Sequence, residues 1–552
     1  MYAVGVGMLP WEVEKARRFI EEIEVGGVFI QPVTGIAFDP ERTADNTNAL
    51  QAMAMAKEIP VPVFIAADQE GGIPQALSRL TGGTDQPGNM GLGATFDPAA
   101  THVSYGIMGE ELSALGINVA FSPVLGLMPS LEESSMYTRC FGEISAEVTA
   151  HARQAVRGLQ ENLVIAASKH FPSHSTAPGD EHFILPVNED DEQTVRDQYL
   201  PPFIAAVEAG DDMMMTTHAV YSAWEAFLPT SFSRRILTDL LRGELGFDGL
   251  IICDAIGMGS IMLTEWDEHP DVLAISAGVD IVLDLAGDAE PLFGVAPGNL
   301  EYAWDVVGQI EAVAEAVTTG GIPAEQIDAS VRRILRTKMK YCLFADPFSD
   351  VAAVGDHLST PEHVETSQGL HADALTLVRN DDGLWPINDA DGTKVHVVCP
   401  RAFLSQMYPD AAWQTIATSD LLKEVRKLAP STRGDKFDVD PKRRAINRIV
   451  RRAKRASADV LVIGTYNAYY YASQRSLVDK LLDLDIPTIL VAVGMPYDLL
   501  AFPEASTYLC SYSNRDLALE TVARGLFGLV EAGGRLPVSL PGLYEVGWSA
   551  GR

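Results

Sequence analysis

Short runs of consecutive apolar residues recur along the first half of the chain, and stretches with helical spacing separate them. A run that is apolar at every position is typical of a parallel strand covered on both faces. Eight such units within roughly 250–300 residues predict a TIM-type (β/α)8 barrel, and a doubly wound sheet is the alternative. The runs are Tyr2–Met8, Gly27–Gln31, Val63–Asp68, Asn118–Pro123, Val164–His170, Met213–His218, Leu250–Asp254 and Asp280–Leu285.

A second alternation of strands and helices follows a long predicted helix over Pro323–Lys340. The pattern indicates a barrel over residues 1–340, a turn-rich linker over 341–370 and a C-terminal αβα sandwich over 371–552. A chain of 552 residues is too long for one ordinary hydrophobic core, which also favours two domains. The strands predicted for the sandwich are Leu375–Arg379, Val395–Cys399, Val460–Thr465, Thr488–Val493 and Thr507–Ser511.

The charge balance is strongly acidic, with 75 Asp and Glu against 41 Lys and Arg and a formal charge of −34. Such a surface repels nucleic acids and anionic membranes, so we expect neither as a partner. The basic block at 442–455, KRRAINRIVRRAKR, carries Ile446, Ile449 and Val450 at helical spacing and is predicted to be an amphipathic helix with a solvated basic face.

The five cysteines are far apart and form no CxxC or zinc spacing, so we expect buried thiols in a cytoplasmic protein. No window approaches the ~18 consecutive apolar residues of a membrane helix. The first residues, MYAVGVGMLPW, lack the features of a signal peptide and are interpreted as a strand. Because a chain that begins with a core strand begins abruptly, we expect a further segment upstream.

Charged side chains follow the predicted strands at one end of the barrel. In parallel barrels the functional groups lie at the carboxyl ends of the strands, where the βα loops gather. Five of the eight strand ends carry such groups, and five structural coincidences are less plausible than one site. They are Asp68 with Glu70, the loop to Arg139, Lys169 with His170, His218, and Asp254.

Asp254 is the sharpest candidate, because it ends the apolar run Leu-Ile-Ile-Cys and a buried carboxylate needs partners or a task. A carboxylate that attacks an anomeric carbon is one such task, and a helix cap is the structural alternative. In the loop after the fifth strand, Asp180 lies two positions from His182. An aspartate beside an imidazole can orient it for general acid/base work, although this spacing alone is weak.

These residues carry a resemblance to glycoside hydrolase family 3, in its β-N-acetylglucosaminidase (β-N-acetylhexosaminidase) branch. Lys169-His170-Phe171-Pro172 with Asp180 and His182 resembles the family signature K-H-F-P-G-H-G…D-S-H. The resemblance continues through most of the chain in one order. It includes D-Q-E-G-G from Asp68, R-C-F-G from Arg139, D-A-I-G-M from Asp254, N-D-D-G-L-W-P-I from Asn380 and R-L-P-V-S-L-P-G-L-Y from Arg535.

The resemblance implies that Asp254 is a nucleophile that forms a glycosyl-enzyme, and that His182, assisted by Asp180, is the acid/base. It implies that Asp68, Arg139, Lys169 and His170 hold sugar hydroxyls, and that no metal or organic cofactor is needed. The substrate would be a small carbohydrate with a terminal β-linked N-acetylglucosamine, from peptidoglycan fragments or chito-oligosaccharides. The oligomeric state is not predicted.

Four departures from the family pattern bear on the substrate rather than on the catalytic positions. Ser173 and Ser175 replace the two glycines of G-H-G, and Gly126 replaces the Asp of P-V-L-D-V. Glu181 replaces Ser or Thr between Asp180 and His182, the positions of the family's acid/base dyad. The loop after Gly72 is also longer than usual. A phosphorylase with the same dyad, a β-glucosidase and a non-catalytic sugar-binding relative therefore remain as alternatives.

Overall fold

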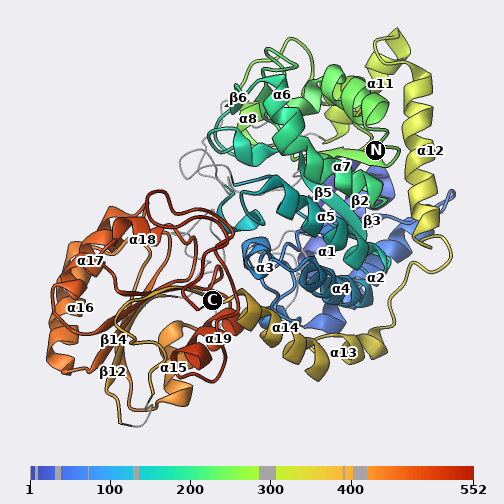
Figure 1. Cartoon of the computed structure of the whole chain (residues 1–552). Coiled ribbons are helices and arrows are strands. Elements are labelled where there is room, and N and C mark those ends of the chain that lie inside the picture. Colours follow the sequence, from blue (N-terminus) through green and yellow to red (C-terminus); the bar gives the residue numbers. More distant parts are fainter. Residues whose placement is uncertain are drawn as a thin grey trace.

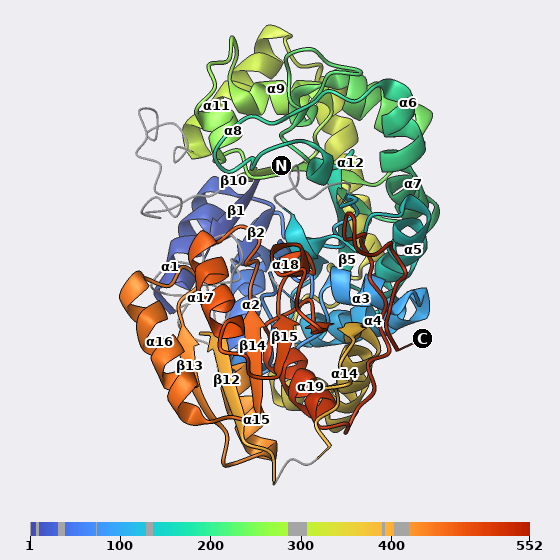
Figure 2. The same ribbon diagram turned by 60° about the vertical axis from the view of Figure 1, so that its left-hand side comes forward.

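The computed structural model describes residues 2–6, 10–30, 39–72, 74–128, 136–284, 306–388, 392–401 and 419–551. The chain forms a two-domain α/β structure (Figures 1 and 2). Its N-terminal part, blue to yellow in Figure 1, contains an eight-stranded sheet, and the orange-to-red C-terminal part contains a six-stranded sheet.

The eight-stranded sheet is parallel throughout and curls until its two ends meet. Its strand order is β10-β1-β2-β3-β4-β5-β7-β9, and a parallel bridge between Ile252 and Ile281 joins β9 to the start of β10. The number and positions of the predicted strands are confirmed, except that residues 7, 8, 31 and 285 of the predicted runs lie outside the described residues. The strands are β1 Tyr2–Val6, β2 Gly27–Ile30, β3 Phe64–Ala67, β4 Val119–Ala120, β5 Ile165–Phe171, β7 Met213–Thr216, β9 Leu250–Cys253 and β10 Val282–Asp284.

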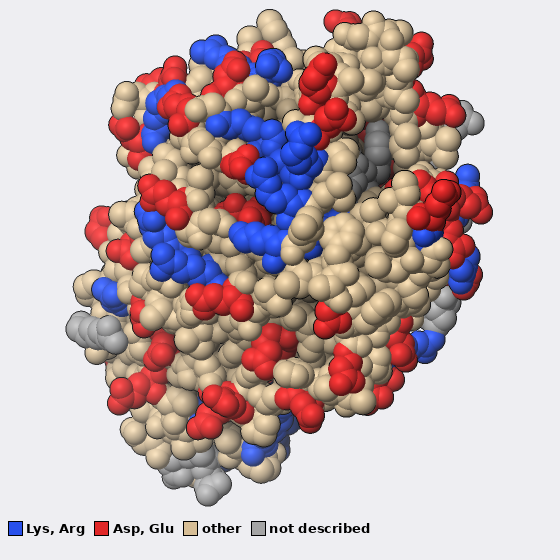
Figure 3. Space-filling view, turned by 90° about the vertical axis from the view of Figure 1, so that its right-hand side faces the viewer, with Lys and Arg blue, Asp and Glu red and all other residues tan. Residues whose placement is uncertain are grey.

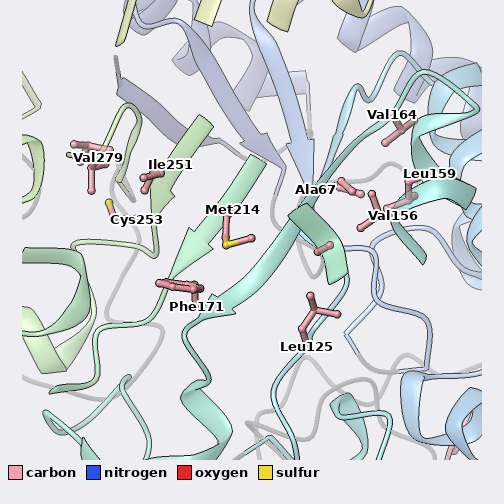
Figure 4. Close-up of a cluster of buried hydrophobic side chains, with 14 of the residues drawn as sticks. Ala67, Leu125, Val156, Leu159, Val164, Phe171, Met214, Ile251, Cys253 and Val279 are labelled. Carbon is pink, nitrogen blue, oxygen red and sulfur yellow. The ribbon is translucent and has the colours of Figure 1, made fainter. Parts of the chain in front are cut away.

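Alternate residues of these strands enter two different apolar clusters, which explains why the runs are apolar at every position. Ile65 and Met214 pack outward against the helices, in the cluster seen in Figure 4. Their neighbours Phe64, Met213 and Met215 pack inward, in a separate cluster enclosed by the curl.

Helices cover the outside of the curled sheet, and a short β6 (Val187–Asn188) and β8 (Val220–Tyr221) pair beside it. Two of the helices begin alike: Asp39 and Asp97 accept a backbone N–H of the first turn and a proline follows each. The helices are α1 Pro10–Arg17, α2 Pro40–Met55, α3 Asn89–Thr95, α4 Pro98–Ala114, α5 Ser145–Gln160, α6 Glu192–Thr194, α7 Leu200–Glu208, α8 Gly259–Met262, α9 Pro270–Ala277, α11 Val306–Thr319 and α12 Ala324–Lys340.

The C-terminal sheet has the order β11-β16-β15-β14-β12-β13, parallel except for the β11–β16 pair. Leu461 and Ile463 of β14 face one apolar cluster, with α16 and α17, while Val460 and Val462 face another, with α15 and α19. The five predicted strands are present, and the edge strand β13 was not predicted. The elements are β11 Thr376–Asn380, β12 Val395–Pro400, β13 Arg433–Phe437, β14 Val460–Thr465, β15 Thr488–Ala492, β16 Thr507–Cys510, α15 Leu421–Leu428, α16 Arg443–Ala456, α17 Ala472–Leu482, α18 Asp498–Ala501 and α19 Asp516–Leu526.

The connection between the two sheets contains α13 (Val354–His357) and α14 (Pro361–Ala374). Helix α14 packs against α3 of the N-terminal part and against α19 of the C-terminal part. The two parts therefore share a helix, as Figure 1 shows.

The distribution of charge is uneven. On the face shown in Figure 3, Lys and Arg side chains gather in the upper half, whereas acidic side chains are scattered over the whole face. The basic block forms α16, whose Ile446 and Ile449 are buried while most of its arginines are exposed, so the predicted amphipathic helix is confirmed. Within the described parts of the chain, no helix combines the length and the hydrophobicity needed to cross a bilayer.

Candidate active site at the carboxyl ends of the strands

The carboxyl ends of the strands and the loops that follow them are here called the rim. Four of the charged residues predicted at the rim belong to one buried network. The Lys169 ammonium, from the end of β5, lies 2.6 Å from Asp68 Oδ1 and 2.7 Å from Glu70 Oε1. Arg139 approaches the same Glu70 with two nitrogens, at 2.9 and 2.8 Å. Two cations and two carboxylates from three neighbouring strand ends are thus held together by their mutual contacts.

The charges of this network stabilise one another. Burial alone would raise the pKa of Glu70, but the positive charges of Arg139 and Lys169 outweigh it and the pKa lies below its ordinary value. Burial would likewise lower the pKa of Lys169, and the carboxylates of Asp68 and Glu70 raise it instead. The network therefore stays ionised, with N–H donors and carboxylate acceptors next to each other, as a polyol ligand requires.

Asp254 follows β9 at the same end of the sheet and is buried. Its Oδ1 accepts a hydrogen bond from Ala255 N at 2.8 Å, and its Oδ2 lies 3.5 Å from His170 Nε2. Burial, and then the charge of Glu181, raises the pKa of Asp254. Burial, and then the charges of Lys169 and Arg139, lowers the pKa of His170 well below its usual range, so this imidazole is neutral.

Asp180 and His182 form a pair in the loop after β5. The Asp180 Oδ1 atom lies 2.6 Å from His182 Nδ1 and also accepts the His182 backbone N–H at 3.0 Å. The side chains are 30% and 14% exposed, so the pair is open to solvent on one side. Burial would raise the pKa of Asp180, but the hydrogen bond and the charge of His182 bring it below its ordinary value. The His182 carbonyl oxygen accepts Gly259 N at 3.1 Å, which attaches the pair to the loop that follows Asp254.

Sequence reasoning missed how two other residues are used. Glu70 was predicted as one of the charged groups at the strand ends, but not as the residue that joins Arg139 to Lys169. Glu181 was noted only as a departure from the family pattern, but its side chain points inward and forms a buried pair with His174. The residue types were visible in the sequence, whereas the contacts between their side chains depend on how the loops fold.

The C-terminal domain contributes to the same rim at two places. Arg515 Nε donates to the carbonyl oxygen of Gly72 at 2.7 Å, in the loop after β3. Gly72 has φ +58° and lies so close to Gly88 that a side chain would not fit. The Tyr470 ring meets the Tyr137 ring edge-on, with centroids 5.7 Å apart. Burial, and then the negative charge of Asp180, raises the pKa of Tyr137, which is consistent with a position near the Asp180–His182 pair.

Two of the departures from the family pattern are a single structural change. A side chain at position 126 would collide with the Ser175 hydroxyl, because the Ser175 side chain fills the space beside Gly126. Gly126 and Ser175 therefore depend on each other. Beside the loop that carries Asp180 and His182, the Ser175 hydroxyl therefore takes the place of the carboxylate in the family pattern.

This fold and site define a glycoside hydrolase, in which a buried carboxylate faces a polar site at the carboxyl ends of parallel strands. Residues 6–337 match the model of the glycosyl hydrolase family 3 N-terminal domain. The chain belongs to glycosyl hydrolase family 3.

Full-length relatives and one solved structure resemble the chain throughout. It is 27% identical to beta-hexosaminidase A of Pseudoalteromonas piscicida, over 90% of this chain and 86% of the relative. It is 26% identical to the beta-N-acetylglucosaminidase/beta-glucosidase of Cellulomonas fimi, over 94% and 88%. The structure of a family 3 beta-N-acetylglucosaminidase from Paenibacillus sp. FPU-7 superimposes with a TM-score of 0.86 at 28% identity, covering 98% of this chain and 97% of that one.

Proposed function

We propose that the enzyme is a retaining, exo-acting β-N-acetylhexosaminidase that releases terminal β-linked N-acetylglucosamine. The observation that carries the proposal is the Asp180–His182 pair, 2.6 Å apart, at the rim where Asp254 lies. A retaining mechanism needs a nucleophile and a group that first gives and then takes a proton. Asp254 supplies the first group and His182 the second.

In the first step the Asp254 carboxylate attacks the anomeric carbon, the bond to the glycosidic oxygen breaks, and the His182 imidazolium gives that oxygen its Nε2 proton. The Asp180 carboxylate accepts a hydrogen bond from Nδ1–H of His182 and stabilises the imidazolium. In the second step neutral His182 takes a proton from water, whose oxygen attacks the same carbon and releases the Asp254 carboxylate. Two displacements at one carbon leave the β configuration unchanged.

Substrate binding falls to Asp68, Arg139, Lys169 and His170. The first three are in the ionised network with Glu70, which offers donors and acceptors fixed in place before the sugar arrives. The neutral His170 ring lies between this network and Asp254 and can hold a hydroxyl without neutralising the nucleophile.

The names of the relatives support an N-acetylhexosaminide as substrate, and the Cellulomonas fimi relative is also named a beta-glucosidase. Peptidoglycan fragments and chito-oligosaccharides are the natural substrates that we propose. We interpret residues 1–340 as a (β/α)8 barrel, 341–370 as the linker and 371–552 as an αβα sandwich. We also place the enzyme in the cytoplasm, in keeping with its five free thiols.

A panel of nitrophenyl glycosides tests the proposal, run with and without inorganic phosphate and followed by NMR of the anomeric proton. We expect hydrolysis of the N-acetyl-β-glucosaminide with β product first, much slower cleavage of the β-glucoside, and no change with phosphate. A glycosyl phosphate product would identify a phosphorylase instead. Initial α product would reject the two-step mechanism.

A further inference from the structure

Glu181 lies between the two members of the dyad, yet its side chain enters the protein interior. It is only 3% exposed. Its carboxylate accepts the backbone N–H of His218 at 2.7 Å and the hydroxyl of Thr217, both in the loop after β7. The same carboxylate pairs with His174, in the loop after β5. One side chain thus ties the dyad segment to two separate strand ends.

The backbone of this segment is attached to a third strand end. The carbonyl oxygen of Glu181 accepts Ser260 N at 2.9 Å, and that of His182 accepts Gly259 N at 3.1 Å, both just beyond β9. A side chain at position 259 would collide with the His182 carbonyl, so the contact requires glycine there. The segment is therefore attached to the loop that follows the proposed nucleophile.

The buried pair is ionised. Burial would raise the pKa of Glu181, but the charge of His174 lowers it to about 2. Burial would lower the pKa of His174, and the Glu181 carboxylate raises it above its ordinary value. An ion pair of this kind is rigid as long as both partners are present, and removal of one partner leaves an uncompensated buried charge.

We propose that Glu181 is a positioning residue of the acid/base step, which anchors Asp180 and His182 against the rim and places a fixed negative charge near Asp254. The proposal rests on the roles proposed above for Asp254 and His182. The family pattern has Ser or Thr at this position, and an uncharged hydroxyl cannot form the ion pair with His174. The anchor is thus a feature of this chain.

The charge of Glu181 has an effect that an uncharged anchor would not have. Burial contributes most to the raised pKa of Asp254, and Glu181 contributes next. A nucleophile must be deprotonated, so this pKa sets the acidic limb of kcat/KM. Four other charged or titratable groups face Asp254. Lys169 and His170 come from β5, Arg139 from the turn before Cys140, and His218 from the loop after β7.

The decisive experiment compares Glu181→Gln with Glu189→Gln, the same chemical change at an exposed position farther along the segment. Kinetics use a nitrophenyl N-acetyl-β-glucosaminide and an N-acetylglucosamine disaccharide. For Glu181→Gln we expect kcat/KM on the disaccharide to fall about 10–100-fold, because a displaced acid costs most when the leaving group is poor. The aryl substrate should lose much less, and the acidic limb should move to lower pH. Glu189→Gln should change none of these.

A second variant tests whether the ion pair maintains the charge of Glu181. His174→Gln keeps a donor for Glu181 but removes the positive charge, so burial should raise the pKa of Glu181 and favour its protonated form. The negative charge near Asp254 is then lost, and the acidic limb should move to lower pH, as in Glu181→Gln. Equal losses on both substrates in Glu181→Gln, or an acidic limb that does not move in Glu181→Gln, would show that Glu181 is merely structural and overturn the proposal.

Hydrogen exchange provides a measurement that does not depend on activity. Amides of residues 173–184 should exchange faster in Glu181→Gln than in the wild type, and unchanged exchange would overturn the anchor. If instead the wild type cleaves no N-acetylglucosaminide, the proposed function fails, while the exchange comparison still tests the anchor.

Discussion

The two ends of the N-terminal sheet bury charge in different ways. At the carboxyl end, Lys169 and Arg139 are buried together with carboxylates that compensate them. At the amino end, Lys338 of α12 is buried, and its ammonium donates to the carbonyl oxygens of Gly26 at 2.9 Å and Pro62 at 2.6 Å. It also lies 4.7 Å from the centre of the Phe64 ring. Among the described residues, no carboxylate pairs with it.

The difference shows what each end is for. Carbonyl groups just before β2 and β3 are fixed by the sheet, so Lys338 closes the amino end and has little freedom to do more. Ile334, Tyr341 and Leu343 complete this closure with apolar side chains. At the carboxyl end the charged groups compensate one another and still face a polar site. In closed parallel sheets, residues at the amino ends of the strands generally serve stability, and residues at the carboxyl ends serve function.

The largest effect should come from removing the proposed nucleophile, Asp254, at the carboxyl end. Asp254→Asn should lower kcat by at least about three orders of magnitude, since no covalent intermediate can form. Its melting temperature should not fall, because burial raises the pKa of Asp254 and thus disfavours its charged form in the folded state. Calorimetry and steady-state kinetics measure both. A variant that keeps more than about a tenth of wild-type turnover would reject Asp254 as nucleophile.

The next effect separates proton transfer from binding. His182→Ala should slow disaccharide cleavage about 10–100-fold more than nitrophenyl glycoside cleavage, because nitrophenolate leaves with little protonation. Asp180→Asn should also slow the disaccharide more than the nitrophenyl glycoside, since the imidazole loses the carboxylate that orients it. Equal slowing of both substrates by His182→Ala would make His182 a binding residue.

The smallest effect on activity should come from the amino end. Lys338→Met should lower the free energy of unfolding by about 1–3 kcal/mol, because the carbonyl oxygens lose a buried donor, and leave kcat nearly unchanged. Burial lowers the pKa of Lys338 from 10.5 to about 7. The unfolded chain therefore binds the extra proton between these values, and wild-type stability relative to Lys338→Met should rise with pH across that range. Urea titrations between pH 7 and 10 measure this difference. A large loss of kcat without loss of stability would contradict the comparison.

Hydrophobic pattern alone located most of this fold. Thirteen predicted strands correspond to strands of the structure, because parallel strands in both domains are buried on two faces. The missed strand, β13, reads Arg-Gly-Asp-Lys-Phe and lies at a sheet edge, where only part of it is buried. Edge strands carry charges that hide them from a search for apolar runs.

The residues of the site could be predicted from the sequence, but the contacts between them could not. Motif spacing pointed to Asp180, His182 and Asp254, whose roles stay predictions. Nothing in the sequence indicated that Glu181 turns inward toward His174 and Thr217, since those contacts depend on how the loops after β5 and β7 meet in space. Lys338 was equally hidden, because a lysine in an amphipathic helix normally lies at the solvent face.

One apolar cluster crosses the boundary between the two domains. Met90 and Ala94 of α3, together with Cys140, pack in the same cluster as Ile463 of β14 and Leu536. Both domains thus contribute to this core, and separating them at the connecting helix would expose apolar surface on each. The enzyme should melt as one cooperative unit, with a single calorimetric transition for both sheets.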